Sequence, residues 1–223
     1  LATLSLSTPT PHNAVYIHVC KDELKGVASV AFEDGGIGVY DVADGIRETG
    51  RVKDGVYTAW ASWVDEERRV VVACGDLGYW NAYSLDTMER IGKYQHDNQG
   101  REVTHFCPHP TDKNSLLIGG FDGILAVHDL RKLGTPVSKH KIIDGGLWRI
   151  VADVNDKGEA VYGVATCSEN QFLVLNEKYE VVKKVESGEG SWAYGIGWGK
   201  GIGRGHIMAC SFYDKSTYLF RGF

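Results

Sequence analysis

Aromatic and acidic side chains recur at two kinds of position along this 223-residue chain. Large aromatic residues or histidine stand where apolar, β-rich runs begin, and acidic residues stand between pairs of such runs. The first set is Trp60, His105, Trp148 with Arg149, and Trp192 with Tyr194; the second is Asp76, Asp122, Glu169 and Asp214. Aromatic faces beside carboxylates attract cations, and quaternary ammonium groups in particular, by about 0.5–2 kcal/mol. The chemistry indicated is the binding of a cationic group.

Each of these positions also has a structural explanation. A Trp at the start of a strand often packs between neighbouring sheets, and an Asp in a turn often accepts hydrogen bonds from backbone N–H groups. A binding site is therefore predicted only if the two sets converge in space.

Common catalytic signatures are not found in the sequence. It has no GxSxG elbow, GxxxxGK[ST] loop or HExxH helix. The glycine-rich stretch 195–205 is not followed by a helical pattern, so we interpret it as a loop rather than a dinucleotide site. The eight histidines never pair at metal-ligand spacing. No metal or other cofactor is expected.

An internal repeat supplies the elements that would position these residues. An apolar run, a Gly or Ser, an acidic residue and a second apolar run recur, as in VASVAFEDGGIGVYDV from Val27 and LLIGGFDGILAVHDLR from Leu116. The acidic residues Asp34, Asp76, Asp122, Glu169 and Asp214 are 42, 46, 47 and 45 residues apart. This period is typical of a propeller blade of about 40–45 residues. We predict an all-β WD-repeat β-propeller, with about five blades in this chain and seven in the complete ring.

The repeat also predicts where the site lies. Each blade is expected to have four antiparallel strands, the third ending in a WD-like pair such as Tyr40-Asp41 or His128-Asp129. The loop entering a blade and the turn between its second and third strands then open on the same face. Residues 1–6 (LATLSL) form either the outer strand that closes the ring or the tail of a preceding blade. One domain over residues 1–223, lacking N-terminal blades, is expected.

Composition narrows the class of protein. A net charge of −5 disfavours nucleic-acid binding, and no apolar run approaches the roughly 20 residues that cross a bilayer. The five cysteines are odd in number and lack CxxC spacing, so we expect buried free thiols in a reducing compartment. A cytoplasmic monomer is predicted.

Several motifs, spread from Val56 to Tyr218, resemble those of one family. They are GGLWRI at 145–150, SWAYGIGW at 191–198, ACSFYD at 209–214, Ala59-Trp60, CGD at 74–76, GGFDG at 119–123 and ATCSENQFLVLN at 165–176. Their order is similar to that of the WD-repeat diphthine methyl esterases. The chain departs from the family pattern at Glu189-Gly190, which replaces a polar residue such as histidine, and at 195–198, which lack an acid.

The resemblance implies an activity and its substrate. The activity is a carboxylic ester hydrolase that removes the methyl ester from methylated diphthine on translation elongation factor 2, in diphthamide biosynthesis. Arg149 would bind the ester carbonyl or the product carboxylate, and the base would be Asp76, Asp214 or His105, with Ser211 or Cys210 less favoured as a nucleophile. The trimethylammonium group of diphthine would be bound by aromatic residues, namely Trp60, Trp148, Trp192, Tyr194 and Tyr213. The alternatives are a non-catalytic WD-repeat scaffold and a methylammonium-reading module.

Overall fold

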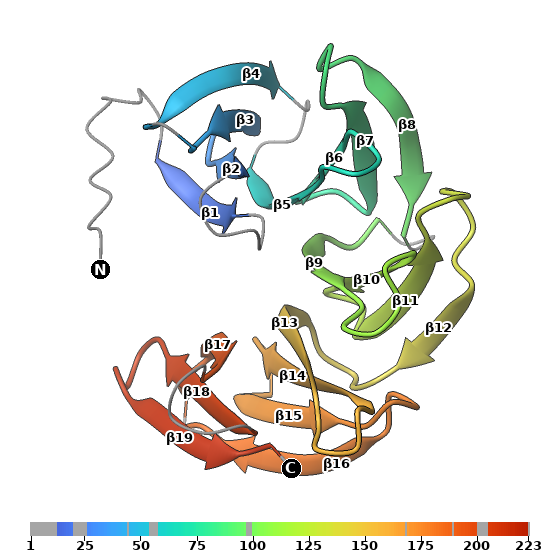
Figure 1. The fold of residues 1–223 in the computed structure, drawn as a ribbon. Coiled ribbons are helices and arrows are strands. Elements are labelled where there is room, and N and C mark those ends of the chain that lie inside the picture. Colours follow the sequence, from blue (N-terminus) through green and yellow to red (C-terminus); the bar gives the residue numbers. More distant parts are fainter. Residues whose placement is uncertain are drawn as a thin grey trace. The chain divides into compact units, whose positions relative to one another are not determined.

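The computed structural model describes residues 13–19, 26–43, 45–53, 58–96, 100–167, 169–188, 190–199 and 205–222. The expectations for residues 1–6, Cys20 and Glu189 lie outside these ranges. All regular elements in the described part are β-strands (Figure 1). No helix there has the length and apolar character needed to span a membrane. The chain divides into two compact units, residues 1–93 and 94–223.

The first unit contains two antiparallel sheets whose strands lie side by side in chain order. One sheet consists of β1 (Ala14–Val19), β2 (Val27–Phe32), β3 (Gly36–Asp41) and β4 (Arg47–Lys53). The other consists of β5 (Ala59–Asp65), β6 (Val70–Gly75), β7 (Tyr79–Ser84) and β8 (Arg90–Gln95), within which the unit boundary falls.

The second unit contains three antiparallel sheets. The first is β9 (Val103–Pro108), β10 (Ser115–Gly120), β11 (Ile124–Asp129) and β12 (Ser138–Lys141). The next is β13 (Leu147–Val154), β14 (Ala160–Thr166), β15 (Gln171–Leu175) and β16 (Val181–Glu186). The last has three strands in the described residues, β17 (Ala193–Trp198), β18 (His206–Ser211) and β19 (Thr217–Arg221). The five sheets confirm the five predicted repeats.

The amino-acid composition of a strand depends on whether it is an inner or an outer strand of its sheet. In the first four sheets the second and third strands are almost wholly buried because both of their faces are covered, and they contain apolar runs such as AVYGVAT in β14. In the last sheet, β18 alternates between buried and exposed residues. Outer strands carry charge, as in RETGRVK of β4 and VVKKVE of β16. Charged side chains protect such sheet edges from further pairing.

Neighbouring sheets within a unit pack face to face. In the second unit, Leu117 and Leu125 of one sheet share a core with Leu147, Ile150 and Leu173 of the next. A side chain at Gly119 would bring its Cβ within 2.7 Å of the Ile150 Cδ1 atom. The glycine therefore lets the two sheets approach closely. Ala165 and Phe172 form the corresponding core with Ala193 and Ala209 of the last sheet.

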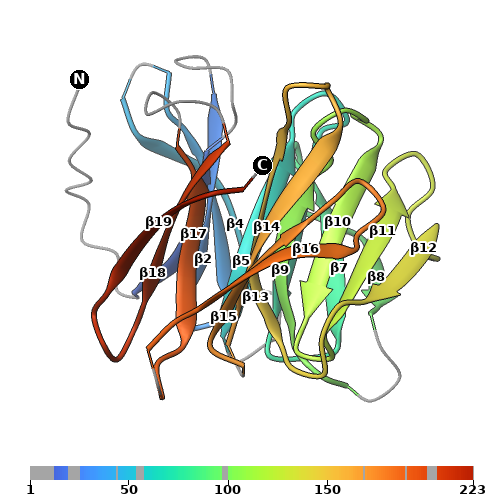
Figure 2. The same cartoon turned by 90° about the horizontal axis from the view of Figure 1, so that it is seen from below.

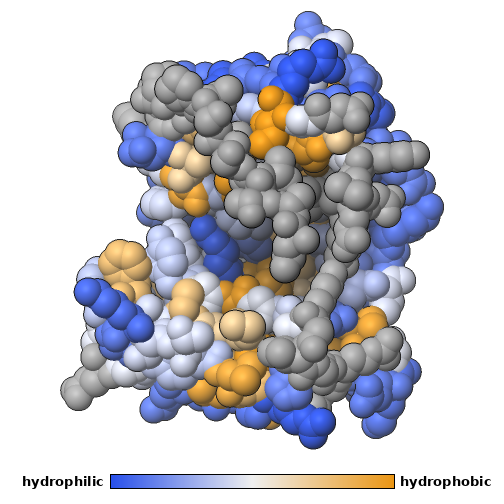
Figure 3. Space-filling model, turned by 60° about the vertical axis from the view of Figure 1, so that its left-hand side comes forward, coloured by the Kyte–Doolittle hydropathy of each residue, from blue (hydrophilic) through white to orange (hydrophobic). Residues whose placement is uncertain are grey.

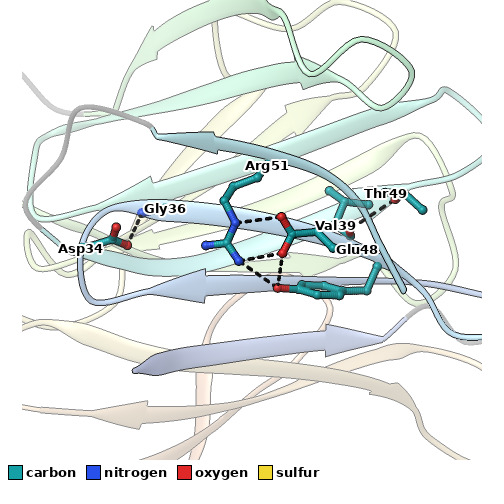
Figure 4. A network of polar contacts seen from close by, with 7 residues as sticks. Asp34, Gly36, Val39, Glu48, Thr49 and Arg51 are labelled. Atoms are coloured by element: carbon teal, nitrogen blue, oxygen red, sulfur yellow. Dashed lines mark hydrogen bonds and ion pairs between the residues drawn. The ribbon is translucent and has the colours of Figure 1, made fainter. Parts of the chain in front are cut away.

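Side-chain hydrogen bonds link β3 and β4, the two outer strands of the first sheet (Figure 4). Arg51 donates from Nε and Nη2 to the Glu48 carboxylate at 2.9 and 2.7 Å, and the Tyr40 hydroxyl donates to Glu48 at 2.9 Å. The guanidinium carbon lies 4.5 Å from the centre of the Phe32 ring. Charged groups thus cover an aromatic ring while keeping their own hydrogen bonds.

The cysteine prediction is confirmed in three places and wrong in one. Cys74, Cys107 and Cys167 are buried free thiols, whereas Cys210 is exposed. Burial raises the pKa of Cys167 to about 11, so this thiol is protonated at neutral pH. Cys210 differs because alternate side chains of β18 point away from the core formed with the preceding sheet.

We expect Leu173→Ala to lower the free energy of unfolding by about 2–5 kcal/mol, because it leaves a cavity in the core of the second unit. Urea denaturation followed by circular dichroism measures this loss. Val182→Thr, an exposed position of the same sheet, is the matched control and should change stability by less than about 0.5 kcal/mol. Equal effects of the two substitutions would contradict the assigned core.

Candidate functional site

One backbone hydrogen bond recurs in all five sheets. The residue after the second strand donates its N–H to the carbonyl oxygen of the residue before the first strand. The pairs are Glu33 to Asn13, Asp76 to Thr58, Phe121 to Glu102, Cys167 to Gly146 and Phe212 to Trp192, at 2.9–3.3 Å. Connecting segments gather at the two ends of the sheets (Figure 2). Within each sheet, the residue that follows the second strand therefore lies next to the start of the first strand.

A β-bulge lies at the start of each first strand. The pairing register there omits one residue of that strand; the omitted residues are Val15, Trp60, Thr104, Trp148 and Tyr194. Bulges of this kind redirect a side chain and are frequent beside functional sites. Trp60, Trp148 and Tyr194 are therefore equivalent. In the third sheet the equivalent residue is Thr104, and the predicted His105 is a buried neighbour on β9.

Aromatic rings of the second unit form a continuous series, which we call the aromatic row. Its centroid separations are 6.0 Å for Phe121–Trp148, 5.3 Å for Trp148–Tyr194, 5.3 Å for Tyr194–Phe212, 5.1 Å for Phe212–Tyr213 and 5.7 Å for Tyr213–Trp192. The exposed fraction is 4% for Trp148, 38% for Tyr194, 46% for Trp192, 56% for Phe212 and 59% for Tyr213. The row thus has a buried end and an exposed end.

Arg149 lies at the buried end of the aromatic row. Its guanidinium carbon is 4.5 Å from the centre of the Trp148 ring. Its Nη1 donates to the carbonyl oxygens of Trp148 and Thr104, at 2.9 and 3.3 Å. A guanidinium carries five N–H donors in a planar fork that suits carboxylates. Stacking and backbone anchoring therefore hold a carboxylate-binding group beside the rings.

The GGLWRI motif has a packing explanation. A Cβ on Gly146 would lie 2.7 Å from the Cys167 Sγ atom and 2.8 Å from Phe121 Cδ1. No side chain larger than hydrogen fits there without displacing Phe121, which meets Trp148 edge to face at 71°. The glycine therefore leaves room for Phe121, whose ring packs against Trp148, the ring on which Arg149 stacks.

Asp214 is surrounded by hydrogen-bond donors. Its Oδ1 accepts from the Ser211 and Ser191 hydroxyls, the latter at 2.8 Å, and its Oδ2 accepts from the Tyr218 hydroxyl at 3.1 Å. The bond from Ser211, with those from Ser191, Ser216 N–H and Tyr218, holds the pKa of Asp214 well below its usual range. Such a carboxylate is a weak base that orders the turn.

The remaining predicted residues are not members of the aromatic row. Trp60 and Asp76 belong to the first unit, where the Asp76 carboxylate accepts from Thr58 N–H at 3.2 Å. Asp122 is buried against His96, with 3.4 Å between Oδ1 and Nε2. Within the described ranges, no group of three or more His, Cys, Asp or Glu side chains is arranged to hold a metal.

Sequence reasoning missed Phe121 and Phe212. Both directly follow a second strand and precede the turn acid, in GGFDG and SFYD. Aligning the repeats at the end of the second strand would have placed both at one position, at the same end as the strand starts. Their contacts with Trp148 and Tyr194 required the structure.

Comparisons with known proteins identify a relative by sequence and similar folds among solved structures. No protein-family model matches the chain. The chain is 26% identical to a diphthine methyltransferase homolog of Dictyostelium discoideum, across 83% of this chain and 56% of that protein. The chain therefore spans about half the length of this relative.

Solved structures establish the architecture. The WD40 β-propeller domain of Doa1 superposes with a TM-score of 0.69, at 11% identity, over 91% of this chain and 62% of that chain. The predicted all-β WD40 β-propeller fold is confirmed. At this level of identity the likeness concerns the fold alone.

We expect Asp214→Asn to lower the urea midpoint at pH 7. Because the pKa of Asp214 is lowered in the folded state, its stabilisation is present above the unfolded value of about 4 and is lost as the pH falls below it. The difference from wild type should therefore shrink between pH 5 and pH 2. Asp144→Asn, at an almost fully exposed position, is the control. A pH-independent difference would contradict the role assigned to the Asp214 charge.

Proposed function

We propose that this chain belongs to an enzyme of diphthamide biosynthesis that hydrolyses the methyl ester of methylated diphthine on elongation factor 2. The observation that carries the proposal is Arg149 stacked on Trp148 at the buried end of an otherwise exposed aromatic row. Such a site suits a ligand that combines a carboxyl group with a methylated ammonium group. The name of the Dictyostelium relative refers to diphthine, which has both groups.

The reaction is a simple acyl transfer to water. The water oxygen attacks the ester carbonyl carbon, and the negative charge that develops on the carbonyl oxygen is stabilised by the Arg149 guanidinium. Collapse of the tetrahedral intermediate breaks the bond to the methoxy oxygen, which leaves as methanol after receiving a proton. The product carboxylate stays paired with the same guanidinium.

A base must accept the proton from the attacking water. Among the three predicted bases, we favour His105, which follows Thr104, the residue whose carbonyl oxygen accepts from Arg149. Asp214 is disfavoured because its hydrogen bonds lower its pKa. Asp76 is disfavoured because its carboxylate, in the first unit, already accepts a hydrogen bond from Thr58 N–H. We place the enzyme in the cytoplasm as a monomer that uses no cofactor.

The decisive test is methanol release from methylated elongation factor 2 by the full-length protein. Arg149→Ala should lower the hydrolysis rate by about 100- to 1,000-fold, the usual effect of losing an oxyanion donor. Arg131→Ala, which removes an exposed guanidinium paired with Asp129, should leave the rate unchanged. Cells with Arg149→Ala should accumulate methylated diphthine, detected by mass spectrometry. Wild-type hydrolysis by this variant would overturn the proposal.

The exposed half of the row favours one other function. Tyr194, Phe212 and Tyr213 are half-exposed rings, as a reader of methylated ammonium groups requires. A reader would bind trimethylated peptides without hydrolysing any ester. Binding without methanol release would therefore support the reader, and the absence of both would leave a scaffold role.

A further inference from the structure

Thr104, the bulge residue of the third sheet, differs in residue type from its equivalents in the other sheets. Trp60, Trp148 and Tyr194 place a ring at this position, and Val15 places an apolar side chain there. Thr104 is small, has a hydroxyl group and is fully buried. A buried hydroxyl destabilises the fold unless it forms hydrogen bonds, so its partners indicate the role of the residue.

The Thr104 hydroxyl joins the third sheet to the fourth. Its Oγ1 donates to the carbonyl oxygen of Gly119, on the neighbouring strand β10, at 3.1 Å. It also donates to the carbonyl oxygen of Leu147, the first residue of β13 in the next sheet. A threonine hydroxyl has one proton, which is therefore shared between two carbonyl oxygens on different sheets. Valine, which has the same shape without the O–H group, would leave both hydrogen bonds unmade.

The backbone of Thr104 forms a second link to the same strand. Its carbonyl oxygen accepts a hydrogen bond from Arg149 Nη1 at 3.3 Å, and the same nitrogen donates to the Trp148 carbonyl oxygen at 2.9 Å. Arg149 lies two residues after Leu147 on β13. Thr104 thus contacts the start of β13 through its hydroxyl and the guanidinium through its carbonyl oxygen. The hydroxyl bond therefore fixes this carbonyl group relative to the strand that carries Arg149.

The small size of Thr104 matters as well. Its side chain is fully buried and already touches the Leu147 backbone. A ring at this bulge, of the kind found at Trp60 or Tyr194, would have to displace the start of β13. The type of residue at the bulge therefore decides whether a sheet contributes a ring of its own or anchors the arginine of the next sheet.

Thr104 does not lie on a surface that a ligand can reach. In Figure 3, where the side that carries β17–β19 in Figure 1 has come forward, hydrophobic side chains reach the surface among hydrophilic neighbours. Phe212 and Tyr213, which follow β18, are more than half exposed, whereas the exposed fraction of Thr104 is 0%. An effect of Thr104 on a ligand must therefore pass through another residue, and Arg149 is the charged group that it contacts.

We propose that Thr104 is a positioning residue, which holds the Arg149 guanidinium in the orientation that binds a carboxyl group. Its hydroxyl fixes the backbone, and the backbone carbonyl oxygen fixes the guanidinium over the Trp148 ring. The inference deepens the proposed function and rests on it for the natural ligand. Its physical content is narrower, because it states only that carboxylate binding by Arg149 depends on the Thr104 hydroxyl.

The test measures binding without any ester. Glycine betaine, which has a carboxylate and a quaternary ammonium group, is titrated into the full-length protein and followed by tryptophan fluorescence. Thr104→Val should weaken betaine binding by about tenfold, because the guanidinium loses its fixed orientation. Thr104→Ser, which keeps the hydroxyl, should restore the affinity to within about twofold. In the Arg149→Ala background, Thr104→Val should have no further effect, because residues that act through one group are not additive.

The matched control is Thr49→Val in the first sheet. It removes a hydroxyl that likewise donates to a backbone carbonyl oxygen, that of Val39 at 3.2 Å, and it should leave betaine affinity unchanged. All titrations are made below the urea and temperature range in which any variant unfolds.

Three outcomes overturn the inference. They are the absence of betaine binding to the wild-type protein, an unchanged affinity in Thr104→Val, and an equal loss from Thr104→Val with and without Arg149. The last would mean that the threonine acts on the fold as a whole. Failure of the proposed function is distinct from these. A protein that binds betaine through Thr104 and Arg149 but releases no methanol retains the positioning residue and loses only the esterase.

Discussion

The hydrogen bond between the residue after the second strand and the residue before the first strand organises every sheet of this protein. It ties two segments that are about 20 residues apart in sequence at one end of the sheet. The bulge next to it turns one side chain of the first strand out of the regular alternation. In every sheet, the side chain at the bulge and the side chain after the second strand therefore lie at the same end of the sheet.

The aromatic row uses this repeated geometry. Trp148 and Tyr194 stand at bulges, and Phe121 and Phe212 stand directly after second strands. The same backbone positions hold Val15 and Thr104 in other sheets, where no comparable aromatic contact forms from the bulge residue among the described residues. The scaffold is therefore general, while the residue types at a few equivalent positions form the aromatic row.

The acidic residues in the turns have different hydrogen-bond partners in different sheets. Asp34 and Asp122 each accept a hydrogen bond from the N–H two residues on, whereas Asp76 accepts from Thr58 across the sheet end. Asp214 gathers hydroxyl donors that lower its pKa. The acids also differ in position: Asp76 is the first residue after its second strand, Asp122 the second and Asp214 the third. This explains why their similar spacing in the sequence was a poor guide to a shared catalytic role.

The sequence by itself determined the all-β repeat, the strand pairs and the acidic turns, because strand patterning and turn chemistry depend on neighbouring residues. It also indicated Trp148, Arg149, Trp192, Tyr194 and Tyr213. Only the tertiary structure decided that Phe121 and Phe212 join them and that Thr104, not His105, is the bulge residue. Ring contacts such as Trp148–Tyr194 link separate sheets, and a bulge shifts the register by one residue, which exchanges the two faces of a strand.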